Sequence, residues 1–386
     1  MIKRTMAREL RTLIQEYPVV TVLGPRQAGK TTLVKAVLKG YAYSNLEEPD
    51  VRELAMQDPR AYLARYPGPV ILDEIQRVPE LLSYIQAIVD GEKRNGRFVL
   101  TGSHQLRLRE AVTQSLAGRT SILTLYPLSL AELESAGQSA GGFEEAAFRG
   151  FLPRLHAESL RITPFHSNYY QTYVERDVRQ LIQLKDAALF EKTMKLVAGR
   201  TGQLMDYASL ANDVGVDAKT IRHWLSILEA SFVLFKLPPY FENFGKRVIK
   251  SPKYYFTDVG LLCFLLGIRM PEQISRDPLV GAMFENLVIM ECLKAQANRG
   301  DMPALYYYRD SHGNEVDLLV PEGRTLHAAE IKSAHTFSDR LLQGLRKFRA
   351  QSGCTGRTML IYNGERCKLS DGVEAVPFGQ ASRLIG

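Results

Sequence analysis

The chain has 386 residues, of which 45% are hydrophobic, enough for two or three cores of an ordinary globular protein. Its longest apolar stretch, Val259–Ile268, is too short to span a bilayer, and its start is amphipathic and not secretory, so we expect a cytoplasmic protein without membrane contact. Four scattered cysteines indicate neither a zinc site nor a disulfide framework, and a net charge of +7 permits nucleic acid binding without requiring it.

The first predicted elements are a strand, a glycine-rich loop and a helix. Val19–Leu23 is apolar and β-branched, the next eight residues fit GxxxxGK[ST], and a helical pattern runs on to Gly40. The amides of such a loop and the helix dipole converge on an anion. Lys30 is expected against the β- and γ-phosphates and Thr31 on Mg²⁺. We therefore predict ATP binding, although the residues alone do not separate ATP from GTP. The predicted contacts are Gly24, Pro25, Arg26, Gln27, Ala28, Gly29, Lys30, Thr31 and Thr32.

Two carboxylates end another predicted strand. After a strand at residues 41–46, the run Pro69–Leu72 is apolar and is followed by Asp73 and Glu74. A parallel sheet presents ligands at the carboxyl ends of its strands, so Asp73 is expected to hold Mg²⁺ directly or through water. Glu74 is suited to polarising an attacking water. Hydrolysis is therefore expected as well as binding.

A fourth and a fifth strand are predicted at Arg97–Ser103 and Ser121–Leu125. Ser103, or as second choice Thr101, is a candidate to contact the γ-phosphate or the lytic water; the alternative is an N-cap for a helix over 105–115. Arg119 precedes the fifth strand and is a candidate arginine finger for its own or a neighbour's phosphate. A solvated surface role is the alternative.

Helices follow the fifth strand. A long helix is predicted from Asn168 to Lys195 as a lid over the nucleotide, and its Arg176 and Arg179 are phosphate candidates. Two further helices, Tyr207–Val214 and Ala218–Glu229, flank a turn at Gly215 and indicate a helix-turn-helix. A wing is predicted over residues 244–253. Such a unit either contacts DNA or serves as a lid or subunit contact. The DNA candidates are Lys219, Thr220, Arg222, His223, Lys246, Arg247 and Lys250.

The last hundred residues contain a second candidate site. A hairpin across residues 310–314 carries Asp317, and the next strand carries Glu330 and Lys332 on one face. With Glu285 from a preceding helix, these carboxylates are candidates to hold Mg²⁺ or Mn²⁺ beside Lys332. The set resembles the PD-(D/E)xK nuclease-like fold, although Val316 stands where that pattern has proline.

The motifs resemble an AAA-type ATPase of the extended P-loop class, with an additional strand and a catalytic glutamate. The whole chain resembles a prokaryotic family that joins such an ATPase to an uncharacterised C-terminal domain. This resemblance implies ATP hydrolysis in a homo-oligomer, for which a hexameric ring is one arrangement. The segments that carry it are 24–32, 72–79, 100–103, 115–119, 173–179, 256–262 and 315–317.

The expected fold is α/β, with a parallel P-loop NTPase sheet, a helical lid, a winged helix-turn-helix and a C-terminal α/β restriction-endonuclease-like domain. The expected boundaries are 1–127, 128–200, 201–255 and 256–386. The expected function is an ATPase that moves its lid and C-terminal domains, acting on DNA with metal-dependent cleavage as one output. The alternative is a nucleotide-gated switch that binds DNA or a protein partner without cutting.

Overall fold

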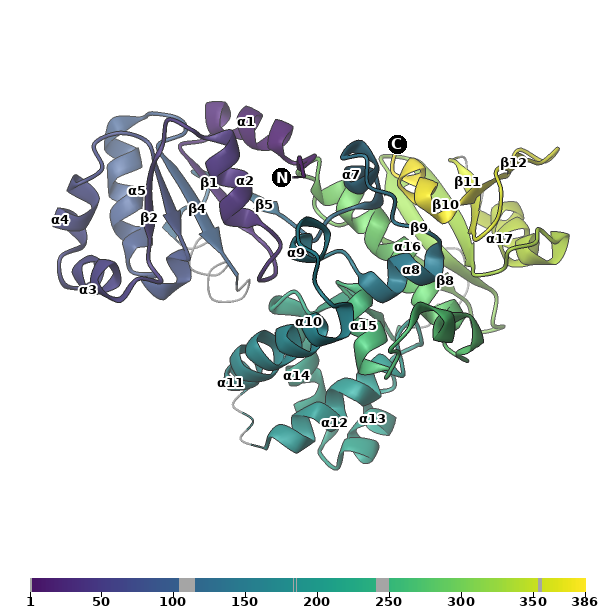
Figure 1. The fold of residues 1–386 in the computed structure, drawn as a ribbon. Helices are drawn as coiled ribbons and strands as arrows, with labels where there is room; N and C mark the ends of the chain where they lie inside the picture. Colours follow the sequence, from purple (N-terminus) through teal and green to yellow (C-terminus); the bar gives the residue numbers. More distant parts are fainter. Residues whose placement is uncertain (1, 104–114, 183, 185, 241–249, 353–355) are drawn as a thin grey trace.

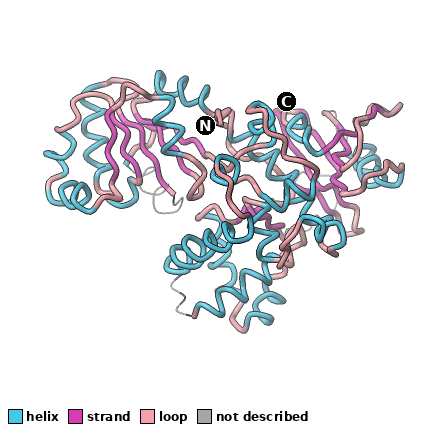
Figure 2. The backbone as a smooth tube through the Cα atoms, in the orientation of Figure 1, coloured by secondary structure: helices cyan, strands magenta, loops and turns pink. Residues whose placement is uncertain are grey.

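The computed structural model describes residues 2–103, 115–182, 184, 186–240, 250–352 and 356–386. In Figure 1 a five-stranded sheet lies at one end of the molecule, a mixed sheet at the other, and a helical lobe between and below them. Figure 2 shows the strands gathered mainly at the two ends. None of the helices in the described part of the chain combines the length and the hydrophobicity that a membrane span requires.

The N-terminal sheet consists of five parallel strands in the order β2-β3-β4-β1-β5. They are β1 (Val19–Leu23), β2 (Ala42–Asn45), β3 (Val70–Asp73), β4 (Phe98–Gly102) and β5 (Thr120–Thr124). All were predicted close to these limits, and the apolar runs of β1, β3 and β4 are buried throughout. β4 separates β1 from β3, so the additional strand that the resemblance implies is present.

Helices cover both faces of this sheet (Figure 1). One face packs against α1 (Ala7–Glu16) and α2 (Lys30–Val37). The other face packs against α4 (Pro59–Ala64) and α5 (Leu81–Glu92), with α3 (Pro49–Gln57) beside α4. Successive side chains of β1 point to opposite faces of the sheet: Val20 and Val22 pack on the side of α1 and α2, and Val19 and Leu23 on the side of α5.

The helical segment after β5 differs from its prediction. It contains α7 (Leu130–Ser135), α8 (Phe143–Arg149), α9 (Pro153–Ala157), α10 (Ile162–Tyr169), η2 (Tyr170–Val178), α11 (Arg179–Ile182) and α12 (Ala187–Ala198). The expectation of one continuous helix from Asn168 to Lys195 is wrong. The turns of η2 are wider than those of an α-helix, and a new helix starts where the Asp186 carboxylate accepts the N–H of Leu189 at 3.0 Å.

The predicted helix pair is present as α13 (Tyr207–Val214) and α14 (Ala218–Ala230). Gly215 ends α13 with a φ of +95°. β6 (Leu234–Leu237) and β7 (Lys253–Phe256) follow as an antiparallel pair. Lys246 and Arg247 lie outside the described residues, whereas Lys250 is exposed. Lys253, which the predicted wing includes, is buried and so is unsuited to meeting phosphate.

The C-terminal sheet is mixed, with the order β12-β13-β11-β10-β9-β8. Its strands are β8 (Tyr306–Arg309), β9 (Glu315–Glu322), β10 (Thr325–Lys332), β11 (Thr358–Tyr362), β12 (Cys367–Lys368) and β13 (Glu374–Pro377). The helices beside it are α16 (Val280–Ala297), η4 (Asp339–Leu342), α17 (Gln343–Ser352) and η5 (Phe378–Leu384), whereas α15 (Val259–Leu265) and η3 (Pro271–Arg276) pack on α16 and α8. The predicted hairpin is confirmed by the antiparallel pairing of β8 with β9.

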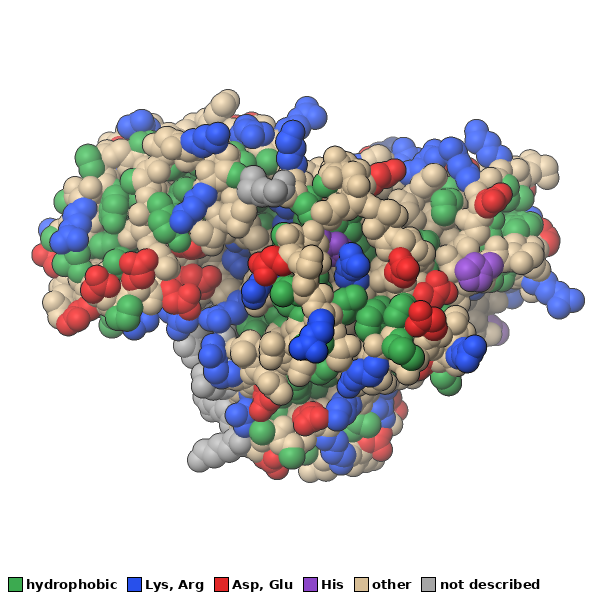
Figure 3. Space-filling model, viewed as in Figure 1, with side chains coloured by type: hydrophobic (Ala, Val, Ile, Leu, Met, Phe, Trp, Pro, Cys, Tyr) green, Lys and Arg blue, Asp and Glu red, His purple; other side chains and the backbone are tan. Residues whose placement is uncertain are grey.

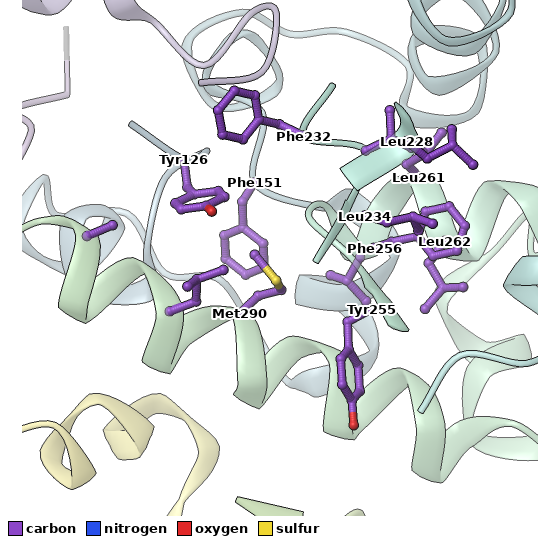
Figure 4. Close-up of a cluster of buried hydrophobic side chains, with 14 of the residues drawn as sticks. Tyr126, Phe151, Leu228, Phe232, Leu234, Tyr255, Phe256, Leu261, Leu262 and Met290 are labelled. Carbon is purple, nitrogen blue, oxygen red and sulfur yellow. The ribbon is translucent and has the colours of Figure 1, made fainter. Parts of the chain in front are cut away.

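α16 joins the parts of the molecule. One face of the C-terminal sheet packs against it, and the other packs against α17. The segment that leaves β5 also lies on α16: Tyr126 and Phe151 gather above the helix near Met290 (Figure 4). The Tyr126 ring meets Phe232 edge-on, with 6.1 Å between ring centroids. A single hydrophobic cluster therefore runs from the N-terminal sheet through the helical lobe to α16.

Candidate active site

The phosphate loop connects β1 to α2 with a backbone that requires glycine at its first position. Gly24 has a φ of +150°, and a Cβ placed there would lie 2.1 Å from the carbonyl oxygen of Leu125. Gln27 and Gly29 also have positive φ, at +61° and +89°. These conformations turn the chain tightly enough for α2 to start directly at Lys30, with Gly29 as its N-cap.

Lys30 lies over this loop. Its buried ammonium donates to the carbonyl oxygens of Gly24 and Pro25, at 2.9 Å each. Burial lowers the pKa of Lys30 to about 8, against the opposing pull of Glu74 and Asp73. Because a phosphate oxygen is a stronger acceptor than a carbonyl, an entering triphosphate can take over these hydrogen bonds.

Asp73 gathers three hydroxyl groups at the end of β3. Its Oδ2 accepts from Thr31 at 2.8 Å and from Tyr43 at 2.7 Å, and its Oδ1 accepts from Thr101. The two predicted Mg²⁺ ligands, Thr31 and Asp73, are thus in contact. Carboxylate and hydroxyl oxygens suit Mg²⁺, which completes its shell with water and substrate phosphates.

Tyr43 was not predicted as a site residue. It stands on β2 next to β3, and burial and its hydrogen bond to Asp73 raise the pKa of its phenol, which keeps it a donor. The sequence offered one signal for Tyr43: it lies on an alternating strand that ends level with Asp73.

Glu74 lies beside Ser103, because these residues follow the carboxyl ends of the neighbouring parallel strands β3 and β4. Glu74 adopts a left-handed backbone with a φ of 59°, and its Oε2 accepts from the Ser103 hydroxyl at 3.2 Å and from the Gln76 amide. Thr101 accepts the backbone N–H of Glu74 at 3.2 Å. Gln76 was not assigned a role from sequence. The helix that Ser103 or Thr101 was expected to cap, over 105–115, lies outside the described residues except for Ser115.

Arg119 does not reach the phosphate loop of its own subunit, so that part of its prediction is wrong. The register pairs Val19 with Thr120, which places Arg119 at the amino ends of the strands, roughly 16 Å from the loop end of β1. Its guanidinium pairs with Asp90 at 2.5 and 2.9 Å on the protein surface.

The helical lobe packs directly on the phosphate loop. The Tyr169 hydroxyl donates to the backbone carbonyl of Arg26 at 3.5 Å, and the Arg26 guanidinium lies 5.8 Å from the Tyr173 ring centroid. Arg179 donates through Nε to the Glu175 carbonyl at 3.3 Å. Tyr169 and Tyr173 were not predicted as site residues. The sequence signal that could have identified them is the spacing of two aromatic residues four positions apart on a helical segment.

The C-terminal candidates pair with two different lysines. Lys332 Nζ lies 2.9 Å from Asp317 and 2.7 Å from Glu330, so these three residues meet as predicted. Glu285 instead accepts from Lys253 at 3.0 Å and from the Tyr255 hydroxyl.

The expected metal centre of three carboxylates stays a prediction. Across the described ranges, no three His, Cys, Asp or Glu side chains are placed to hold a metal ion together. Each of the three carboxylates pairs with a lysine, Glu285 with Lys253 and the other two with Lys332. Burial, followed by the charge of Asp317, raises the pKa of Glu330 to about 8.

The helix-turn-helix candidates differ in exposure. Lys219, Arg222 and His223 are exposed on α14. The Thr220 hydroxyl instead donates to Asp217 at 2.6 Å, and its N–H donates to the same carboxylate. Thr220 thus belongs to the N-cap of α14. Basic and acidic side chains are interspersed on the face of the molecule in Figure 3.

The fold and this site define an AAA-type P-loop ATPase domain followed by a C-terminal mixed-sheet domain. Residues 16–134 match the model of the AAA domain. Residues 141–272 and 280–381 match two domains of unknown function, DUF8612 and DUF4143. The AAA domain supports ATP hydrolysis.

Relatives extend over nearly the whole chain. Uncharacterized protein Rv2008c of Mycobacterium tuberculosis is 33% identical over 380 residues, which cover 98% of this chain and 84% of that protein. The chain belongs to the family of this mycobacterial protein. Uncharacterized protein MJ1637 of Methanocaldococcus jannaschii is 24% identical, with 93% and 83% covered.

Among solved structures, the Walker-type ATPase PABY2304 of Pyrococcus abyssi aligns with a TM-score of 0.47 and 14% identity, over 69% of this chain and 96% of its own. RuvB of Thermotoga maritima aligns with a TM-score of 0.30 and 20% identity, over 60% and 89%. Because both scores are below 0.5, the assignment depends on the AAA domain match and on the geometry of the site.

Proposed function

We propose that this chain hydrolyses ATP with Mg²⁺ and uses the cycle to move its helical lobe and C-terminal domain. The observation that carries the proposal is the meeting of Thr31, Asp73 and Glu74 at one sheet edge, under a phosphate loop that the helical lobe touches. Mg²⁺, when bound, neutralises the charge of the β- and γ-phosphates.

Each side chain has a distinct task in this mechanism. Lys30 exchanges two loop carbonyls for phosphate oxygens, and Thr31 and Asp73 hold the metal. Glu74 accepts a proton from the attacking water, while Ser103 fixes the carboxylate in place. Loss of the γ-phosphate then alters the loop on which Tyr169 and Tyr173 pack, and so moves the helical lobe.

The test is calorimetry with ATP and with GTP in magnesium buffer, together with phosphate release. Lys30→Ala should weaken binding by at least ~10-fold, because it removes a charged donor. Lys39→Ala is the matched control, since Lys39 is an exposed lysine just beyond the same helix. Absence of any heat with wild type and either nucleotide would overturn the proposal.

For the later units we propose a lid over 128–200, a winged helix-turn-helix over 201–255 and a restriction-endonuclease-like domain over 256–386. The pair α13 and α14 with the β6–β7 ladder supports the second unit. The order of α16, the β8–β9–β10 strands, α17 and β11 supports the third.

DNA is the partner we propose for α14. Three candidates are exposed on this helix and a fourth is exposed further along the chain: Lys219, Arg222, His223 and Lys250. The hydroxyl of Thr220 is instead engaged in a hydrogen bond to the N-cap residue of α14. Affinity for duplex DNA should fall by about 0.9 log unit per phosphate contact for each log unit of salt. A salt-independent affinity, or none, would leave a protein partner as the alternative.

The output that we favour is nucleotide-gated binding without cleavage, because the Lys332 ammonium is engaged by both Asp317 and Glu330. Cleavage is the second candidate, because those three residues do meet on β9 and β10. Plasmid incubated with Mg²⁺ or Mn²⁺ separates the two. Nicking that disappears in Asp317→Ala and Lys332→Ala, but persists in the surface control Asp339→Ala, would establish cleavage.

We also propose that the chain acts as a homo-oligomer, with a hexameric ring as one arrangement. Since Arg119 lies far from its own loop, a phosphate contact by this residue requires a neighbouring subunit.

A further inference from the structure

A charged side chain from the start of the chain is enclosed behind the phosphate loop. The Arg4 side chain is 8% exposed, and it pairs through Nε with the 1% exposed Glu132 of α7 at 3.1 Å. Its other nitrogens donate to backbone carbonyls: Nη1 to Ala28 of the phosphate loop at 2.7 Å, and Nη2 to Tyr126 after β5 at 2.7 Å. One guanidinium thus joins three segments.

The contact with Ala28 bears on phosphate binding through the planarity of the peptide bond. In a trans peptide the C=O and the next N–H point in opposite directions. Because the Ala28 carbonyl is held by Arg4, the amide N–H of Gly29 is directed away from Arg4. Gly29 is the N-cap of α2, whose terminal amides form the anion site of such a loop. Arg4 thereby fixes the direction of one phosphate-binding amide.

The same guanidinium is connected to the C-terminal domain. Glu132 also accepts the N–H groups of Thr5 and Ser129, at 2.7 and 3.0 Å, which fixes the start of α7. The next residue, Leu130, donates its N–H to Glu291 of α16 at 2.8 Å.

Lys294 of α16 completes this attachment. It donates to the Leu128 carbonyl at 2.8 Å and to Glu291 at 2.7 Å. Glu291 and Lys294 are both buried. Tyr126, whose carbonyl binds Arg4, packs above this helix in Figure 4.

We infer that Arg4 is a positioning residue for the phosphate loop, and that through Tyr126 and Glu132 it transmits the state of the loop to Glu291 and Lys294 of α16. Nucleotide entry withdraws Lys30 from the Gly24 and Pro25 carbonyls and reshapes the loop. Because Arg4 bonds both to the loop and to Tyr126 and Glu132, a movement of the loop is passed through Arg4 to the segment 126–132. The inference rests on the proposed function, since it assigns a regulatory route to the same ATP site.

The test compares Arg4→Lys with Arg97→Lys. Arg97 is a matched control, because it too is buried and donates to two carbonyls, of Gly68 and Tyr66, and to one glutamate, Glu92. It precedes β4, so it lies at the sheet edge opposite the loop. Lysine keeps the charge but cannot reproduce the planar fork of donors.

Calorimetry with ATP and Mg²⁺ should show binding weakened at least ~10-fold in Arg4→Lys, which corresponds to about 1.4 kcal/mol. Arg97→Lys should bind like wild type, even where urea unfolding shows that both variants lose stability. Equal affinity in the two variants would overturn the inference while leaving the ATPase intact. No binding by wild type would overturn the proposed function, and the inference with it.

A second measurement starts from the wild-type protein. Amide hydrogen exchange of wild type, with and without ATP and Mg²⁺, should change in residues 126–132 and in the turn of α16 that carries Glu291 and Lys294. If Arg4→Lys folds, that response should be lost, while it should persist in Arg97→Lys. A wild-type protein that binds ATP with unchanged exchange in both segments contradicts the transmission to α16.

Discussion

Replacing Gly24 with alanine tests the backbone geometry that forms the phosphate loop. The added methyl carbon would lie 2.1 Å from the Leu125 carbonyl oxygen, and Gly24 has a φ of +150°. The neighbouring strands are held by the Leu125 N–H bond to the Leu23 carbonyl at 2.8 Å, so the clash is relieved only by moving backbone. Overpacking costs about 1–3 kcal/mol and an unfavourable positive φ about 1–2 kcal/mol. We expect a loss of ~2–5 kcal/mol in the free energy of unfolding.

Substitutions at two other glycines separate the steric contribution to the loss of stability from the backbone contribution. Gly118 has a φ of +73° with open space around a Cβ, so Gly118→Ala should lose only the ~1–2 kcal/mol of the backbone term. Gly40 has open space and no positive φ, so Gly40→Ala should stay within about 0.5 kcal/mol of wild type.

Urea unfolding of the three variants gives the free energies, and calorimetry with ATP and Mg²⁺ gives the affinities. Gly24→Ala should also weaken ATP binding, because the shifted loop no longer directs its amides at one point. The reasoning is refuted if Gly24→Ala unfolds and binds nucleotide as Gly40→Ala does.

Three further changes test the site and the core. Glu74→Gln should bind ATP with wild-type affinity but release phosphate ~10²–10⁴-fold more slowly, whereas normal turnover would show that another group is the base. Arg119→Ala should lower turnover by ~10³-fold or more only at protein concentrations where subunits assemble; equal rates for variant and wild type at every concentration would remove the neighbour role. Burial lowers the pKa of His166, so the unfolded chain takes up a proton first and wild type should lose up to about 1.4 kcal/mol of stability per pH unit as pH falls below 6.5. His166→Gln should make that dependence less steep in urea unfolding at pH 5 to 7, and an unchanged slope would contradict the assignment.

The sequence alone determined the N-terminal sheet and its motifs. Contiguous apolar runs such as Val19–Leu23 identify buried parallel strands, and the residues that end them fall at one sheet edge because parallel strands all end there. Thr31, Asp73, Glu74 and Ser103 were therefore predictable as neighbours, since local patterning and strand direction specify them.

Contacts between distant segments were decided only by the tertiary structure. The strand register placed Arg119 at the amino edge beside Asp90, and packing paired Glu285 with Lys253 and Asp317 with Lys332. Whether a titratable side chain meets a counter-ion depends on chain packing many residues away, for which the sequence gives no periodic signal. Arg4 is the clearest case, because its partners lie 24, 122 and 128 residues along the chain, and only folding brings them to one guanidinium.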